Sequence, residues 1–330
     1  MRVGVLGLGL GKHYVAAFNE DENVDEIVLC DEDINRINKI PTSVNKVISA
    51  YTKLEDMLKA EKLDVAAIVT PDHFHRSHTE AVLNAGIHVL LTKPVSTNLA
   101  DAKAIIRLSE SLDLKLMIAH EARFRSNFAK IKEIVQQGKL GELIYIRLDH
   151  LYRKYKQFAA NSWYASPESG RTAIVGSGIH EVDLIRYITG KRIESAFAVA
   201  NKLGELDFPG NKTVAASFTL QDHTIAQVML TYEAPEGVPE ESISLMGTQG
   251  MIIGGKVYSG GQVIENLPTE DNSTRAGIIG CVKSFLQSII DDTPLLVNGR
   301  DAYASLAACV AADNSVKQGE TTIPESEYFN

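Results

Sequence analysis

Three glycines near the start of the chain have the spacing of a turn that binds a dinucleotide. Residues 7–12 have the sequence GLGLGK and stand between an apolar run, residues 2–6, and a helical pattern. A dinucleotide needs one glycine for the tight turn and a second where the backbone approaches the pyrophosphate, whose charge the N–H groups of the helix start then bind. Gly7 and Gly9 suit these roles, although Lys12 occupies the position of the usual third glycine and Gly11 comes one residue early. A tight turn without a ligand would also explain this motif taken alone.

An acidic residue follows where the ribose of a dinucleotide would be bound. Asp31 ends the second strand-like run, 24 residues after Gly7. A carboxylate at this place accepts hydrogen bonds from the adenosine ribose and repels a 2′-phosphate, so it favours NAD over NADP. Arg36 is the nearby residue that could bind a phosphate, and a helix N-cap is the alternative role for Asp31. The order of strand, glycine turn, helix, strand and acid predicts a dinucleotide site.

Two further junctions between a strand and a helix carry polar residues. Thr70 and Pro71 follow the apolar run 64–69, and Lys93 stands between Thr92 and a proline after the run 88–91. The carboxyl ends of parallel strands meet at one edge of a sheet, which is where ligands of such folds bind. A solvated surface lysine is the alternative for Lys93.

These motifs lie within an alternation of short β-branched runs and helical patterns that fills the first 119 residues. Such alternation predicts a parallel sheet with helices on both faces, a doubly wound domain. The expected strands are residues 2–6, 26–30, 64–69, 88–91 and 115–119, and the expected helices are residues 15–19, 54–60, 77–85 and 99–112.

Beyond residue 119, long strand-like runs follow one another with few helices between them. Strands joined without helices pair antiparallel, so this part predicts an α+β domain with one large, open, mostly antiparallel sheet flanked by helices. The expected strands are residues 143–151, 193–202, 213–219, 224–232 and 242–246, and the expected helices are residues 126–137, 179–189, 278–291 and 300–316. We therefore expect a dinucleotide-binding domain at residues 1–120 and a substrate-binding and oligomerisation domain at residues 121–330.

Motifs spread in order over residues 3–190 resemble those of the Gfo/Idh/MocA family, named for glucose–fructose oxidoreductase, inositol dehydrogenase and rhizopine catabolism. The stretch 298–319 is similar as well. The motifs are the Gly7/Gly9 turn, Thr70-Pro71 with His75, residues 86–89 (GIHV), Lys93-Pro94, Arg123-Phe124, residues 138–142 (GKLGE) and residues 178–183 (GIHEVD). The resemblance implies an N-terminal Rossmann domain, a C-terminal open sheet and a substrate bound between them. Members mostly oxidise or reduce a carbinol carbon of a sugar or cyclitol with NAD(P).

The resemblance also implies catalytic roles for Lys93 and His180. In the family, this lysine contacts both the substrate and the nicotinamide region, and this histidine acts as the acid/base. Removing a hydride from a carbinol requires its hydroxyl proton to leave, and a neutral imidazole accepts a proton near pH 7. A histidine facing the core is the alternative for His180, but Asp183, one turn later, favours a functional pair. The residues expected to bind the cofactor are Gly7, Gly9, Leu10, Lys12, Asp31, Thr70, Pro71, His75, Thr92 and Lys93.

Three positions depart from the family pattern. Thr92 stands where a glutamate usually precedes Lys-Pro, and Gly176 stands where an aspartate is often found four residues before the histidine. The glycine-rich stretch before that helix is Ser169-Gly170-Arg171 here. Asp183 or a group of the substrate would have to take the role of the missing carboxylate.

Three histidines, His73, His75 and His78, have the spacing HxHxxH, and Asp72 is adjacent. Imidazoles at such spacing can share a metal ion, but a catalytic zinc normally needs a third ligand and often a carboxylate. The resemblance instead implies that His75 lies near the nicotinamide ribose, with His73 and His78 solvated. We therefore expect no bound metal.

Rings and charged groups are expected to bind the substrate, because sugars stack on aromatic faces and charged groups bind their hydroxyls or carboxylates. Tyr152 and Trp163 fall between the first long strand of the second domain and the His180 helix, where a packed sheet edge or a subunit contact is the alternative. His120 and Arg123 follow the last strand of the first domain. The expected substrate-binding residues are His120, Arg123, Tyr152, Trp163 and Asp183.

The composition excludes several classes of protein. The chain has 330 residues, 45% of them apolar and 23% charged, with a net charge of −9. This acidic balance argues against a nucleic-acid surface, and no apolar run reaches the roughly 18–20 residues that cross a bilayer. Three scattered cysteines do not form a disulfide framework, so we expect a reducing, cytoplasmic location.

The sequence thus predicts a cytoplasmic NAD-dependent oxidoreductase for a small sugar-like or cyclitol-like substrate. One alternative is a glycosidase that uses transient oxidation and elimination, which would consume no net NAD. Another is a sugar or NAD sensor without activity, which Thr92 and Gly176 motivate. Because a broad apolar sheet face is not left in water, we also expect a homodimer or homotetramer through the C-terminal sheet.

Overall fold

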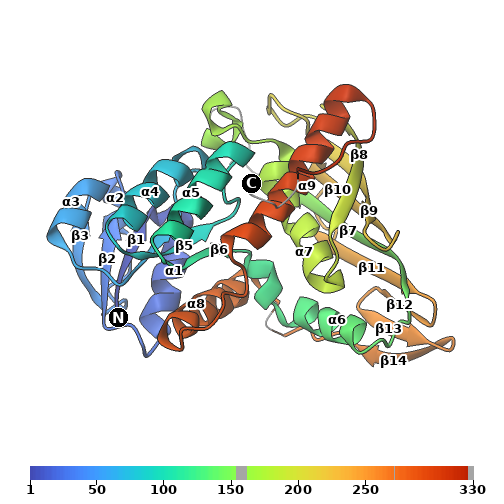
Figure 1. Cartoon of the computed structure of the whole chain (residues 1–330), viewed down its shortest axis with the longest axis horizontal. Helices are drawn as coiled ribbons and strands as arrows, with labels where there is room; N and C mark the ends of the chain where they lie inside the picture. The colour runs from blue at the N-terminus through green and yellow to red at the C-terminus, as the bar shows by residue number, and fades with distance from the viewer. Residues whose placement is uncertain (154–161, 271, 326–330) are drawn as a thin grey trace. The chain divides into compact units, whose positions relative to one another are not determined.

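The computed structural model describes residues 1–153, 162–270 and 272–325 (Figure 1). Within them the chain forms two compact units, each with its own sheet. The first unit comprises Met1–Phe124 and Ser273–Tyr303, and the second comprises the described residues of Arg125–Asn272 and Ala304–Asn330. The division into domains at residue 120 stays a prediction, because compactness does not show which segments fold independently.

The first unit contains a six-stranded parallel sheet in the order β3-β2-β1-β4-β5-β6. Its central strands are buried along almost their whole length, as is usual where helices cover both faces of a parallel sheet. The prediction of a doubly wound parallel sheet is therefore confirmed. The strands are β1 (Arg2–Leu6), β2 (Glu26–Cys30), β3 (Val47–Tyr51), β4 (Val65–Ile68), β5 (His88–Thr92) and β6 (Leu116–Ala119).

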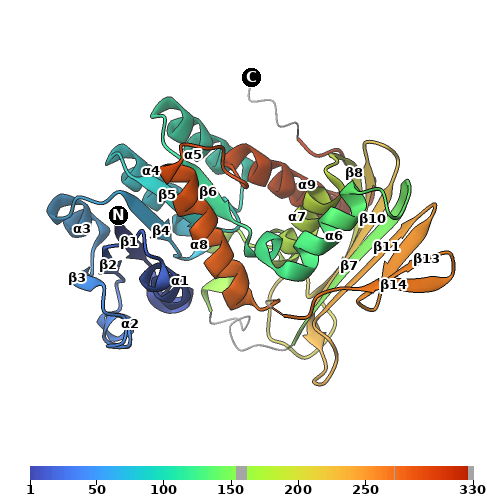
Figure 2. The ribbon, with the colours of Figure 1, turned by 90° about the horizontal axis from the view of Figure 1, so that it is seen from below.

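Helix α8 (Thr274–Ile290) belongs to this first unit although it follows the second sheet in sequence. It lies beside α1, as α4 lies beside α5 (Figure 2). A Cβ on Gly277 of α8 would lie 2.5 Å from the carbonyl oxygen of Glu121, so this close approach requires glycine. The other helices of the unit are α1 (Leu8–Glu20), α2 (Ile34–Asn38), α3 (Leu54–Ala60), α4 (His75–Asn84) and α5 (Leu99–Ser111), with the short 3₁₀ turns η1 (Asp72–Phe74) and η2 (Glu121–Phe124).

The second unit contains an eight-stranded sheet in the order β14-β13-β12-β11-β7-β10-β9-β8. Neighbouring strands pair antiparallel except β7 and β10, which pair parallel, so the prediction of a large, mostly antiparallel sheet is confirmed. The strands are β7 (Leu143–Arg153), β8 (Ile193–Asn201), β9 (Thr213–Leu220), β10 (Ile225–Ala234), β11 (Glu241–Gly247), β12 (Gly250–Ile253), β13 (Lys256–Ser259) and β14 (Gln262–Asn266).

Helices pack on one face of this second sheet, where α7 contacts β7 and β10. Alternate residues of β10, among them Val228 and Leu230, are buried on that face. The opposite face carries exposed apolar side chains, including Phe197 and Val199 of β8 and Met246 of β11. The helices are α6 (Ser126–Gln136), the π-helix η6 (Ile174–Gly178) that continues into α7 (Ile179–Thr189), and the larger part of α9 (Gly299–Gln318), with the 3₁₀ turns η4 (Trp163–Ala165) and η5 (Pro167–Ser169).

The sequence did not predict several short elements, namely β3, α2 and β12 to β14. Strand β3 is an edge strand with alternating half-buried and exposed residues, and β12 to β14 have only four or five residues each. Such elements carry little apolar periodicity, so their sequences resemble loops. Among the described residues, no helix is long and apolar enough to cross a membrane.

Candidate functional site

The glycine turn lies at the carboxyl end of β1, between the ends of β2 and β4. Gly7 has a φ of 86°, and its N–H donates to the carbonyl oxygen of Cys30 at 2.8 Å. A Cβ on Gly7 would lie 2.5 Å from the carbonyl oxygen of Val69, so the turn requires glycine on both grounds. A Cβ on Gly9 would have no atom within 4 Å, whereas Gly11 packs against β1. The turn therefore presents open backbone at Gly9, as a close approach of pyrophosphate requires.

Helix α1 begins directly after this turn, so the N–H groups of its first turn lack intrahelical acceptors. The N–H of Leu8 donates to Oδ2 of Asp31 at 2.6 Å. Leu10 and Lys12 are exposed to solvent at this end of the helix. The residues expected to contact the pyrophosphate thus lie together at one helix N-terminus, which favours an anion.

Asp31 is buried at the carboxyl end of β2, with a total exposure of 3%. Besides the bond from Leu8, its Oδ1 accepts a hydrogen bond from the N–H of Asp33 at 2.9 Å. The N-cap of α2 is Asp33 and not Asp31, which removes the alternative role of Asp31 as a helix cap. Nη1 of Arg36 lies 3.5 Å from both carboxylate oxygens of Asp31. The carboxylate is therefore fixed beside the glycine turn.

His75 connects the two other junctions at this edge of the sheet. Its side chain is fully buried, with Nδ1 2.8 Å from the carbonyl oxygen of Pro94 and Nε2 3.1 Å from that of Thr70. Oγ1 of Thr92 donates to the carbonyl oxygen of Ile68 at 3.1 Å. These contacts join the end of β4 to the end of β5. They fix the turn that carries Lys93, while a contact of His75 with cofactor stays a prediction.

The neighbouring histidines are held by other contacts. Nδ1 of His78 lies 3.1 Å from Oγ1 of Thr70, and the ring of Phe74 stacks on the ring of His78 with centroids 5.2 Å apart. Burial, with a smaller effect of His75, lowers the pKa of His78 to about 4. The His78 side chain is half-buried, with Phe74 and Thr70 against it, so the expectation that His78 is solvated is wrong. Within the described parts of the chain, no three His, Cys, Asp or Glu side chains are grouped to hold a metal ion.

His120 and Arg123 are both buried where β6 leads into η2. Nη2 of Arg123 lies 2.7 Å from Oδ2 of Asp301, at the start of α9. This ion pair lies within the first unit. It engages the Arg123 guanidinium, the charged group that the sequence suggests for substrate binding. Substrate binding by His120 and Arg123 stays a prediction.

In the second unit, His180 is the second residue of α7 and is half-buried. Asp183 is buried, and its Oδ1 accepts a hydrogen bond from Oγ of Ser305 at 2.9 Å. Nη1 of Arg186 donates to the same serine oxygen at 2.9 Å. The Asp183 carboxylate thus joins α7 to α9, and its role toward a substrate stays a prediction.

The residue after His180, Glu181, forms a buried ion pair that was not expected from the sequence. Nδ1 of His150, on β7, lies 2.7 Å from Oε1 of Glu181. Burial is the largest influence and acts against a charged imidazole, but the Glu181 carboxylate outweighs it and raises the pKa of His150. The ring of Tyr152 stacks on His150 with centroids 3.6 Å apart, and burial raises the pKa of Tyr152 well above its usual value. No periodicity or spacing relates His150 to Glu181 in the sequence.

Trp163 lies in the same unit beside Arg171, which belongs to the stretch that departs from the family's glycine-rich pattern. The rings of Trp163 and Tyr164 stack with centroids 4.0 Å apart. The guanidinium carbon of Arg171 lies 4.5 Å from the Tyr164 ring centroid and 5.5 Å from that of Trp163. An arginine on aromatic faces is held by cation–π attraction. The replacement of an expected side chain by Gly176 was the one sequence signal of this arrangement.

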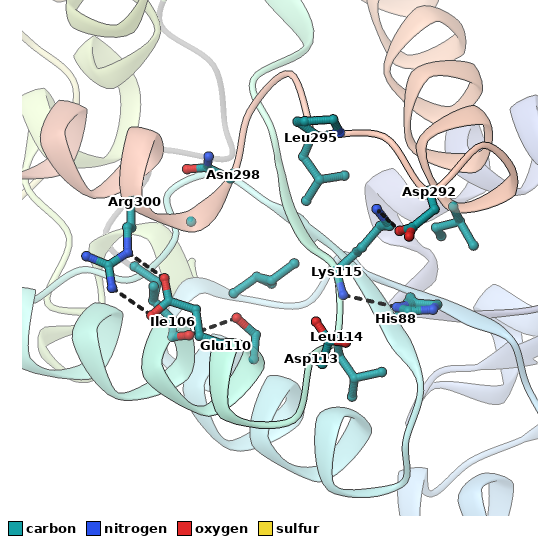
Figure 3. A pocket seen from close by; sticks show the side chains of 15 residues that line it. His88, Ile106, Glu110, Asp113, Leu114, Lys115, Asp292, Leu295, Asn298 and Arg300 are labelled. Atoms are coloured by element: carbon teal, nitrogen blue, oxygen red, sulfur yellow. Dashed lines mark hydrogen bonds and ion pairs between the residues drawn. The ribbon is translucent and has the colours of Figure 1, made fainter.

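A cavity of about 540 Å³ lies at the amino ends of β5 and β6, at the opposite sheet edge from the glycine turn (Figure 3). Two ion pairs line it. Arg300 binds Glu110 at 2.5 and 2.8 Å, and Lys115 lies 3.0 Å from Asp292 (Figure 3). Ligands of doubly wound folds bind at the carboxyl edge, so this cavity is not the candidate cofactor site.

The structure gathers the candidate residues in two sets. The cofactor candidates from Gly7 to Lys93 lie at the carboxyl edge of the first unit's sheet. His180, Tyr152 and Trp163 belong to the second unit. Joint action of Lys93 and His180 stays a prediction.

Two sequence models of one family match this chain. A model described as "Oxidoreductase family, NAD-binding Rossmann fold" matches residues 1–120. A model described as "GFO/IDH/MocA C-terminal domain" matches residues 128–253. Together they cover most of both units.

Individual relatives are distant in sequence. The chain is 23% identical over 336 residues to a myo-inositol 2-dehydrogenase of Thermotoga maritima, which covers 96% of this chain and 97% of that protein. An uncharacterized oxidoreductase of Synechocystis sp. is 23% identical over 237 residues, which are 71% of this chain and 64% of that protein. The structure of scyllo-inositol dehydrogenase from Lactobacillus casei, with NAD(H) and scyllo-inositol, has a TM-score of 0.83 at 22% identity and covers 99% of both chains. This last similarity supports the fold.

Proposed function

Since the chain belongs to the Gfo/Idh/MocA oxidoreductase family, we propose that it oxidises a carbinol carbon of a sugar-like or cyclitol-like polyol with NAD. One observation carries the proposal: the buried Asp31 carboxylate is bonded to Leu8 of the glycine turn, at the sheet edge where Lys93 follows β5. The inositol dehydrogenases among the relatives support a polyol as the substrate class.

The residues at this edge fit NAD. Gly9 leaves open backbone beside the start of α1, and the helix N-terminus favours the pyrophosphate. Asp31 provides an acceptor for ribose hydroxyls and a negative charge that opposes a 2′-phosphate, so NAD is preferred to NADP. Bound NAD supplies the hydride acceptor of the reaction.

The chain's own residues handle the proton of the reacting hydroxyl. His180 accepts this proton as the carbon loses its hydride, and it returns the proton in the reverse reaction. Lys93 binds the same oxygen and stabilises the negative charge that develops on it. The contacts of His75 with the carbonyl oxygens of Thr70 and Pro94 support the backbone of the turn that carries Lys93.

We also propose a homodimer or homotetramer built on the outer face of the second sheet. Val199 of β8 pairs with Ala215 of β9, which pairs with Met229 of β10, so an apolar row crosses three strands on that face. Phe197 and Met246 add exposed apolar area on the same sheet. A contiguous exposed apolar patch marks an interaction site, and a second copy of the chain would cover this one.

A screen for NAD reduction tests the proposed activity. The purified chain is mixed with NAD and a panel of inositols, neutral sugars, sugar acids and sugar phosphates, and NADH absorbance is followed. Oxidation of at least one polyol supports the proposal. Release of the aryl alcohol from aryl glycosides without net NADH formation would favour the glycosidase instead.

A further inference from the structure

The first turn of α7, which carries His180, has little in its own sequence to fix its position. It follows the π-helix η6, and the glycines Gly176 and Gly178 lie in that segment. Gly178 is the N-cap of α7, and a glycine has no side chain to accept a hydrogen bond from the helix start. Glycine also leaves the backbone more conformational freedom than other residues do. The position of this turn therefore depends on contacts with other elements of the second unit.

Two polar contacts tie this turn to neighbouring strands of the second sheet. The hydroxyl oxygens of Ser177 and of Tyr232 on β10 lie 2.8 Å apart. Oε1 of Glu181 lies 2.7 Å from Nδ1 of His150 on β7. Strands β7 and β10 pair with each other, and α7 contacts both. His180 lies between the two contacts along the chain, three residues after Ser177 and one before Glu181.

The contact of Glu181 with His150 is an ion pair held out of water. His150 is 7% exposed and Glu181 is 3% exposed. Burial, the largest influence, acts against a charged imidazole, but the Glu181 carboxylate outweighs it and raises the pKa of His150. The other acid beside His150, Glu241, is bound by Arg125, whose Nη1 lies 2.8 Å from both of its oxygens. A hydrogen bond between charged groups is short and directional, so it specifies one geometry where apolar contacts allow several.

Packing alone leaves the Glu181 side chain room to move. Glu181 lines a cavity of about 140 Å³ together with Phe128 of α6 and Leu184 of α7. Among the described residues, Oε2 of Glu181 has no hydrogen-bond partner. The bond through Oε1 therefore selects one position for this carboxylate. The ring of Tyr152, stacked on His150 with centroids 3.6 Å apart, restricts the imidazole in turn.

We propose that the buried pair of Glu181 with His150 positions His180 for the proton transfer. The inference rests on the proposed oxidation of a polyol and adds to it the contact that holds the base. Successive residues of a helix point about 100° apart, so Glu181 can face the sheet while His180 projects in another direction. Glu181 and His150 are positioning residues, because they act through the first turn of α7. A displacement of a reacting group by about 1 Å can lower a rate by about 100-fold.

Variants of the pair test this proposal on the best substrate of the panel. Glu181→Leu removes the carboxylate, and we expect it to lower kcat by about 10- to 100-fold while KM and the NAD Kd change less than about threefold. Glu181→Gln keeps an acceptor for the imidazole N–H, so we expect it to retain kcat within about fivefold of the wild type.

A double variant separates positioning from stability. His150→Leu combined with Glu181→Leu replaces the ion pair by apolar side chains, a change that is often neutral or stabilising for the fold. We expect a melting temperature close to that of the wild type and a kcat as low as that of Glu181→Leu, because the directional contact is gone.

A second buried ion pair of the same unit provides the matched control. Nζ of Lys212 lies 3.4 Å from Oε1 of Glu233, and both side chains are largely buried. Glu233 follows Tyr232 on β10, and successive residues of a strand point to opposite faces of the sheet. We expect Glu233→Leu to lower the melting temperature and to leave kcat unchanged.

Amide hydrogen exchange measures the position of α7 without any substrate. Exchange in the peptide of residues 177–184, followed by mass spectrometry, should be at least about 10-fold faster in Glu181→Leu than in the wild type. It should be close to the wild-type rate in Glu181→Gln and in Glu233→Leu.

The outcomes distinguish this inference from the proposed function. If the wild-type chain oxidises a polyol and both leucine variants of the pair keep its kcat, the pair does not position His180 while the oxidoreductase proposal stands. An equal loss of kcat in Glu233→Leu would also overturn the inference, because any weakened ion pair of the unit would then have the same effect. If the wild-type chain oxidises no member of the panel, the proposed function fails, and unchanged exchange in Glu181→Leu would overturn the role of the pair independently.

Discussion

Replacing Asp31 with asparagine should weaken NAD binding and narrow the preference over NADP. The substitution keeps the shape of the side chain and one acceptor oxygen, but it removes the charge that receives the N–H groups of Leu8 and Asp33. A hydrogen bond to a charged group contributes about 1.5–3 kcal/mol. Because asparagine retains a neutral acceptor, only the charge-dependent part of this bond, about 1 kcal/mol, is lost, so the Kd of NAD should rise by roughly 5- to 10-fold.

The effect on NADP should have the opposite sign. Two unit charges about 6 Å apart near a protein surface repel by about 3 kcal/mol at an effective dielectric constant of ~20. Arg36, with Nη1 3.5 Å from the Asp31 carboxylate, reduces this repulsion and becomes available to a 2′-phosphate once the carboxylate is gone. We expect the ratio of the NADP Kd to the NAD Kd to fall by at least about 10-fold in Asp31→Asn.

Isothermal titration of both cofactors measures this ratio, with melting temperature as the check on folding. Asp33→Asn is the matched control, since it removes the same charge two residues away and asparagine caps a helix as well as aspartate does. An unchanged ratio in Asp31→Asn, or an equal change in Asp33→Asn, would refute the assignment of Asp31 to the ribose.

Two other predictions concern the glycine turn and the outer sheet face. A Cβ on Gly9 would meet no atom within 4 Å, so Gly9→Ala should keep the melting temperature but raise the Kd of NAD by about 10-fold or more. Gly7→Ala should instead lower the melting temperature. An unchanged NAD affinity in Gly9→Ala would remove Gly9 from the cofactor site. Light scattering at micromolar concentration should give the mass of a dimer or tetramer, and Val199→Glu should give a monomer; a monomeric wild-type chain would contradict the proposed interface.

The elements that the sequence predicted best have a strong local pattern. Strands β1 and β2 and helices α3 and α7 begin and end at the predicted residues. Central parallel strands are continuously apolar, and α7 is followed by the C-cap Gly190, whose φ of 68° suits a residue without Cβ. The local pattern failed at β3 and at β12 to β14, which are short and lie toward the sheet edges.

Contacts between distant segments could not be predicted from the sequence. The place of α8 in the first unit depends on close packing of Gly277 against Glu121, far apart along the chain. The contact of His75 with the Pro94 carbonyl and the ion pair of His150 with Glu181 likewise follow from tertiary packing.

The candidate site was predictable where its chemistry is local to one motif. The glycine turn and Asp31 follow from the order of strand, turn and acid, and the structure brings Asp31 to Leu8 at 2.6 Å. Arg171 lies in a loop without periodicity. Its relation to Gly176 is visible only in the structure, where the Arg171 side chain fills the space that a Cβ on Gly176 would need.

The central claim is that Lys93 and His180 serve one proton transfer, and steady-state turnover of their variants tests it most directly. On the best substrate of the panel, Lys93→Met and His180→Ala should each lower kcat by about 10² to 10⁴, with the NAD Kd changed only slightly. The double variant should be scarcely slower than the slower single variant, because groups that act in one step are not additive. Lys62→Met, on an exposed lysine of the first unit, is the matched control and should turn over like the wild type. Turnover close to wild type in both single variants would contradict the account, because neither residue would then serve the proton transfer.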